Sequence, residues 1–148
     1  MRRIFERMVD AAYRPELFDD ADGVLRALAQ EGPVAILSAS PAAVIEMALA
    51  RAGLSGSVGA IRDGRDPTSK AAKLPTLLDQ FGASPRQAVM VGDAVSDIRA
   101  GQANGMRTAA VTWGWQRRVL LAAAGPDWIL TRVEALLTLP DRLRSQSS

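Results

Sequence analysis

Two carboxylates, Asp93 and Asp97, follow a short apolar run, Ala88 to Val91. Such a run bounded by turn residues predicts a buried strand, and Gly92-Asp93 marks its end. Parallel α/β sheets bind ligands at the carboxyl ends of their strands, and carboxylate oxygens suit Mg²⁺. We therefore expect Asp93 and Asp97 to be metal ligands. The alternatives are that Asp97 supports a neighbouring lysine or caps the next helix, and that Asp93 occupies a turn.

The composition restricts the chemistry that could accompany these carboxylates. The 148 residues include no cysteine and no histidine. Disulfides, thiolate catalysis, Ser-His-Asp triads and Cys- or His-ligated metals are thereby excluded. Any catalysis by this chain must use carboxylates, Lys, Arg, hydroxyl groups, backbone amides or a hard metal ion.

Charge and hydropathy bear on the partners of the chain. The net charge is only +2, and the basic residues are spread along the sequence. Nucleic-acid binding normally shows a clustered basic face, so no nucleic-acid partner is expected. No apolar run approaches the roughly 20 residues that span a bilayer, and no leader pattern opens the chain. We expect a cytoplasmic protein with no membrane partner.

The elements that must position the carboxylates alternate along the chain. The expected strands are 34–38, 57–61, 88–91, 107–112 and 127–130. The expected helices are 22–30, 42–52, 70–81, 95–104, 116–124 and 133–139. Strands and helices alternating in this way predict an α/β fold, a Rossmann-like three-layer arrangement of a parallel sheet with helices on both faces.

The two ends of the chain do not follow this alternation. In the segment 2–12 the apolar residues Ile4, Phe5, Met8 and Val9 recur at helical spacing, which predicts an amphipathic helix. We therefore divide the chain into this helix (1–14), a core domain (15–140) and a polar tail (141–148).

The segment VMVGDAVSDIRAGQANGMRTAAVTWGW, residues 89–115, resembles the haloacid dehalogenase (HAD) superfamily, and within it the phosphoglycolate-phosphatase-like branch. The resemblance implies hydrolysis of phosphate monoesters through an aspartyl-phosphate with Mg²⁺. It assigns the fourth motif of the family to Asp93 and Asp97. It assigns the second motif to Ser38 in VAILSASP, where the hydroxyl and the amides of Ala39 and Ser40 would bind phosphoryl oxygens.

The third motif of the family is a lysine that offsets charge on the phosphoryl group. Lys70 and Lys73 are the only two lysines, and they lie one helical turn apart. Lys70, at the expected helix start after Ser69, fits the family position better, and Lys73 is the alternative. A solvated helical lysine is the ordinary fate of this residue type.

The first motif of the family, Asp-x-Asp-Gly after an apolar strand, has no clear counterpart. Asp20 and Asp22, in Asp20-Ala21-Asp22-Gly23, resemble it as nucleophile and acid, but no apolar strand precedes them. We therefore expect the chain to lack the first strand, the nucleophile and most of the cap, with 1–14 as a cap remnant. Two strand edges would then have to pair directly or gain a strand from another chain, which favours a homodimer.

Three functions remain open at this point. The first is a HAD-like, Mg²⁺-dependent phosphatase acting on a small phosphorylated metabolite, truncated and with little activity alone. The second is a non-catalytic relative that binds Mg²⁺ and phosphoryl ligands or a protein partner. The third is a structural module that pairs through an open sheet edge, for which dimerisation would be insensitive to Asp93→Asn.

Overall fold

The computed structural model describes residues 3–5, 9–10, 16–17, 21–38, 41–63, 69–113 and 116–147. Their main feature is a six-stranded sheet with the order β5-β4-β1-β6-β7-β8, in which every pair of neighbours is parallel. Its strands are β1 (Arg3–Phe5), β4 (Val34–Leu37), β5 (Ala60–Arg62), β6 (Ala88–Gly92), β7 (Arg107–Val111) and β8 (Trp128–Leu130). A separate antiparallel pair consists of β2 (Val9–Asp10) and β3 (Glu16–Leu17).

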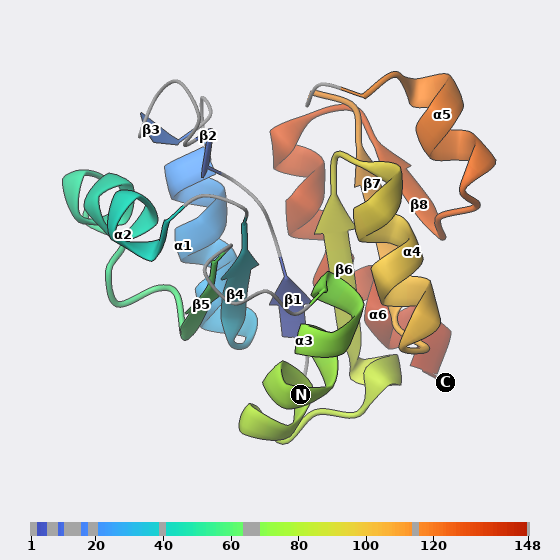
Figure 1. Ribbon diagram of the computed structural model, residues 1–148, viewed down its shortest axis with the longest axis horizontal. Coiled ribbons are helices and arrows are strands. Elements are labelled where there is room, and N and C mark those ends of the chain that lie inside the picture. The colour runs from blue at the N-terminus through green and yellow to red at the C-terminus, as the bar shows by residue number, and fades with distance from the viewer. Residues whose placement is uncertain are drawn as a thin grey trace.

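Helices follow the strands, as the sequence predicts. They are α1 (Ala21–Glu31), α2 (Ala42–Arg51), α3 (Lys70–Gln80), α4 (Val95–Ala103), α5 (Arg118–Ala123) and α6 (Leu139–Ser147), with 3₁₀ turns at Pro85–Gln87 and Val133–Thr138. Helices α3 and α4 lie in front of the sheet and α1 and α6 behind it (Figure 1). The predicted three-layer α/β fold is confirmed.

Strict alternation along the strands builds the core on both faces of the sheet. In β4, Val34 and Ile36 pack with α1, α2 and α6, while Ala35 and Leu37 pack with α3 and α4. Strand β6 alternates in the same way, with Val89 on the first face. Successive side chains of a strand point to opposite faces, so an all-apolar run is what a sheet covered on both sides requires.

The first strand of the sheet corrects the sequence analysis. The described residues of the range 2–12 are strands and not the expected helix: Arg3–Phe5 forms β1 between β4 and β6, and Val9–Asp10 forms β2. Ile4 pairs with Val34 on one side and with Val89 on the other. The expectation of a missing first strand was therefore wrong. The reason given for dimerisation, two unpaired central edges, no longer applies.

The C-terminal segment also differs from expectation. Residues 141–147 of the polar tail belong to helix α6, which packs on the sheet through buried Leu139 and Leu143. Sparse apolar residues at positions i and i+4 lie on one helical face and are enough to fix a polar helix. Among the described residues, no helix is long and apolar enough to cross a membrane.

Candidate functional site

Ser38 and Asp93 lie at one level of the carboxyl edge of the sheet. Val34 and Val89 both pair with Ile4, and Ser38 and Asp93 each come four residues later. Neighbouring strands lie about 4.8 Å apart, so the two residues are roughly 10 Å apart, on either side of the line of β1.

Asp93 begins the loop between β6 and α4. The side chain is half-buried, and its Oδ1 atom is fully buried. Within the same part of the chain, no group of three acidic side chains gathers in one place. Mg²⁺ commonly uses only one or two protein carboxylates and completes its shell with water and substrate oxygens, so a single carboxylate such as Asp93 is compatible with this ion.

Asp97 forms an ion pair with Lys70. The Oδ1 atom of Asp97 contacts Lys70 Nζ, and its Oδ2 atom accepts the backbone N–H of Ala94 at 3.2 Å. Asp97 is 1% exposed and the side chain of Lys70 is 24% exposed. Both carboxylate oxygens are thus engaged by the protein, which favours the alternative in which Asp97 supports a lysine. Ligation of a metal by Asp97 stays a prediction.

Gly92 makes room for this ion pair. A Cβ atom on residue 92 would lie 2.6 Å from Asp97 Cγ, closer than real Cβ atoms come to any neighbour. A side chain at this position would push Asp97 away from Lys70 and from the start of α4. The glycine before the strand-end aspartate is therefore part of the site.

Lys73 has a different partner from Lys70. Its Nζ atom donates to the carbonyl oxygen of Asp63 at 3.0 Å, and the residue is 9% exposed. The Oδ2 atom of Asp63 accepts the N–H of Ala42 at 2.7 Å. Sequence reasoning missed Asp63, because a lone aspartate after a weak strand carries no motif. The only signal was its place at the end of β5, level with Ser38.

Comparisons with known proteins agree with this geometry. Residues 68–136 match the model of the HAD-hydrolase-like family. The phosphoglycolate phosphatase of Synechococcus elongatus is 31% identical over 147 residues, which cover 99% of this chain and 69% of that protein. The chain belongs to the HAD-like hydrolase superfamily, in its phosphoglycolate-phosphatase-like branch.

Two further relatives align with a smaller part of this chain, and a smaller part of their own length is matched. A pyrophosphatase PpaX of Bacillus cereus is 42% identical over 66 residues, 45% of this chain and 31% of that protein. The crystal structure of a predicted phosphoglycolate phosphatase from Haemophilus somnus superposes with a TM-score of 0.75 at 26% identity. That likeness covers 84% of this chain and 57% of the other, so the chain spans little more than half of that relative.

The structure describes some of the residues that the HAD motifs assign to the site. Ser38 is buried directly after β4, and its backbone N–H donates to the carbonyl oxygen of Arg62 at 3.0 Å. Ala39, Ser40 and Asp20 lie outside the described residues. The backbone of Asp22 lies in the first turn of α1. Helix α1 leads into the amino end of β4 through the short turn at 32–33, so the first turn of α1 lies toward the carboxyl side of the sheet.

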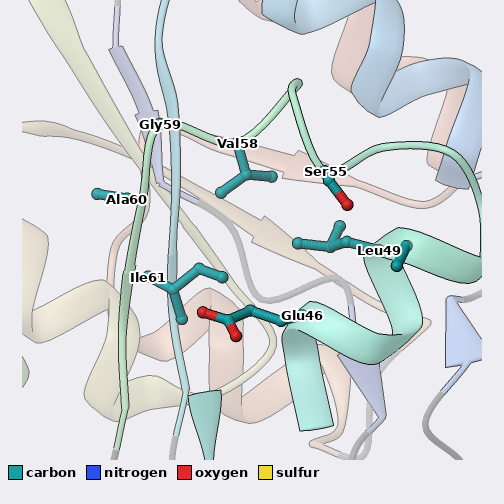
Figure 2. Close-up of a pocket in the computed structure, with 8 residues that line it drawn as sticks. Glu46, Leu49, Ser55, Val58, Gly59, Ala60 and Ile61 are labelled. Carbon is teal, nitrogen blue, oxygen red and sulfur yellow. The ribbon is translucent and has the colours of Figure 1, made fainter. Parts of the chain in front are cut away.

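One cavity of this HAD-like domain lies away from the predicted site. It measures about 540 Å³ and lies between α2 and β5. Glu46 and Leu49 line it from α2 (Figure 2). Val58, just before β5, and Ile61, within β5, line the opposite side. None of the predicted site residues that the structure describes lines this cavity, which separates it from Ser38, Lys70 and Asp93.

Proposed function

We propose that this protein is a Mg²⁺-dependent phosphatase that acts on a small phosphate monoester, and that this chain has little activity alone. The observation that carries the proposal is the common level of Ser38 and Asp93 beside the Lys70–Asp97 ion pair. The relatives named phosphoglycolate phosphatase and pyrophosphatase support a phosphorylated substrate.

The residues of the chain divide the work on the substrate. The Ser38 hydroxyl donates to a phosphoryl oxygen, together with the amides of Ala39 and Ser40. Lys70, held by Asp97, places a positive charge against the same group. Fixed donors aimed at a developing charge stabilise a transition state more than mobile water does. Asp93 would hold Mg²⁺, which neutralises phosphoryl charge when bound.

The proposed enzyme lacks an aspartate nucleophile at the position where the family carries it. The sequence that follows β1 begins Glu6-Arg7-Met8, without the family's aspartates, and lies outside the described residues. Asp20 and Asp22 are the remaining proposed nucleophile and acid. Without an aspartate in line with phosphorus, positioning alone supplies little turnover, which is why we expect low activity of this chain.

The non-catalytic alternative keeps the same site. A protein with Ser38, Lys70 and Asp93 in place but no nucleophile would bind Mg²⁺ and phosphoryl ligands without releasing phosphate. A homodimer also stays a proposal, for which the edge strands β5 and β8 are the available surfaces.

The first test is Mg²⁺ binding by calorimetry to the wild type, to Asp93→Asn and to Asp79→Asn. Asp79 is exposed on α3 and is the matched control for loss of one negative charge. We expect Asp93→Asn to abolish binding and Asp79→Asn to leave it unchanged. An unaltered affinity in Asp93→Asn would remove Asp93 from the metal site. Phosphate release from p-nitrophenyl phosphate then separates a weak enzyme from a non-catalytic binder.

A further inference from the structure

Two consecutive residues at the end of β5 hold both ends of the segment that follows β4. The carbonyl oxygen of Arg62 accepts the N–H of Ser38 at 3.0 Å, and the carboxylate of Asp63 accepts the N–H of Ala42 at 2.7 Å. Ser38 and Ala42 bracket residues 39–41, where the proposed phosphoryl-binding amides lie. The end of β5 thus binds both Ser38 and the start of α2.

Asp63 replaces a local helix cap. Helix α2 begins after Pro41, which makes no side-chain hydrogen bond to the free N–H groups of the first turn. The Asp63 carboxylate supplies that acceptor from 21 residues away. A carboxylate at this place satisfies an open donor and interacts favourably with the positive end of the helix dipole.

Lys73 fixes Asp63 in turn. Its Nζ atom bonds to the Asp63 carbonyl oxygen in a buried position. Burying an ammonium group costs free energy unless strong hydrogen bonds compensate it, so a lysine in this place indicates a role beyond solubility. One turn earlier on the same helix, Lys70 pairs with Asp97 on α4. Helix α3 therefore contacts both sides of the proposed site: Asp63, beside β4, through Lys73, and Asp97, after β6, through Lys70.

We infer that Asp63 and Lys73 are positioning residues, which hold Ser38 and the start of α2 at a fixed distance from Lys70. The inference rests on the proposed phosphoryl site and adds to it. Neither residue is required to touch the substrate. Their effect is to keep the donors of the β4 side preorganised against the lysine of α3, since displacement by about 1 Å is enough to weaken such a site strongly.

The experiment compares Lys73→Met, Lys73→Arg and the control Leu78→Ala. Lys73→Met removes the hydrogen bond and keeps the apolar stem, while Lys73→Arg keeps charge and donors. Leu78 is buried on the same helix, so its truncation destabilises α3 without touching Asp63. Amide exchange of Ala42 reports on the tether, and calorimetry with orthophosphate and Mg²⁺ reports on the site.

We expect Lys73→Met to speed exchange of the Ala42 amide and to raise the Kd for orthophosphate, each about tenfold, the usual effect of losing one buried hydrogen bond to a charged group. Lys73→Arg should restore most of both. The Ala94 amide, bonded to Asp97, should keep its protection in all variants. In Leu78→Ala the amides of Ala42 and Ala94 should change equally.

Two results would overturn the inference: an unchanged Ala42 amide in Lys73→Met, or an equal selective effect in Leu78→Ala. Failure of the proposed function is seen separately. If the wild type binds no orthophosphate, the phosphoryl site is absent, and the exchange of Ala42 alone decides whether Lys73 and Asp63 hold α2.

Discussion

The two lysines of the chain lie one turn apart on α3 and have separate partners. Lys70 reaches forward to a buried carboxylate on α4, and Lys73 reaches a backbone carbonyl at the end of β5. Sequence reasoning treated them as alternatives for one role. In the structure the two lysines do not compete for one position: Lys70 contacts Asp97, and Lys73 contacts the carbonyl oxygen of Asp63.

The Lys70–Asp97 pair should be measurably coupled. Lys70→Met leaves a carboxylate in a position that is 1% exposed, and we expect a loss of about 2 kcal/mol in the free energy of unfolding. Replacing Lys70 by Met leaves the Asp97 carboxylate buried without its ion-pair partner, and Asp97→Asn removes that negative charge. The double variant should therefore recover at least about 1 kcal/mol relative to the sum of the single effects. Chemical denaturation of the four proteins measures this, and strict additivity would show that the two side chains do not interact.

Much of the site could be expected at the level of residues, and the exceptions have a common cause. Ser38, Lys70 and Asp93 could be proposed from the sequence because each follows or begins an element with a clear pattern. Asp63 was missed because its hydrogen bonds join residues 10 and 21 positions away, which no local pattern encodes. The partner of Asp97 was open for the same reason, since the contact spans 27 positions.

Helix α4 packs so closely on the sheet that only a glycine fits at position 101. A Cβ atom on Gly101 would lie 2.7 Å from Met90 Cβ in β6 and 2.7 Å from a methyl carbon of Thr108 in β7. The contact brings the helix down on the two strands and places its first turn, with Asp97, at their carboxyl ends. The position of the ion pair thus depends on a glycine one turn further along the helix.

A matched pair of glycine substitutions tests this dependence. Gly101→Ala should destabilise the protein by about 1–3 kcal/mol, because the added methyl group overpacks a rigid interface. Gly23→Ala, also in a helix, meets nothing within 4 Å and should stabilise by about 0.5 kcal/mol through the unfolded state. Thermal or urea unfolding gives both signs. A neutral Gly101→Ala would mean that α4 can move away from the sheet at no cost.

Elements were predictable where periodicity, length and caps agreed. The helix start expected after Ser69 is confirmed, and the hydroxyl oxygen of Ser69 caps α3 by accepting the N–H of Ala72 at 3.2 Å. The helix expected over 95–104 ends where Gly105 follows it in a left-handed conformation, with a φ of 72°. The strand β1 was missed because Ile4, Phe5, Met8 and Val9 fit a helical face. A three-residue strand between two others is determined by its neighbours, not by its own pattern.

The whole molecule depends on that short strand. Strand β1 pairs with β4 through Ile4 and Phe5 and with β6 through Arg3, Ile4 and Phe5. It thereby joins the half of the sheet that carries Ser38 to the half that carries Asp93. A sheet without it would present two central edges to solvent or to another chain.

The amides of Ile4 and Phe5 give the decisive measurement at this scale. If β1 is the central strand, those amides that enter its ladders should exchange only by global unfolding, with the same free energy as Val89 and Val91 of β6. The amide of Gln80, at the exposed end of α3, serves as a reference for local opening. Fast exchange of Ile4 and Phe5 beside a protected β6 would show that the two halves of the sheet are held together in another way. The alignment of Ser38 with Asp93 through Ile4 would then lose its basis, and with it the observation that carries the proposed phosphatase function.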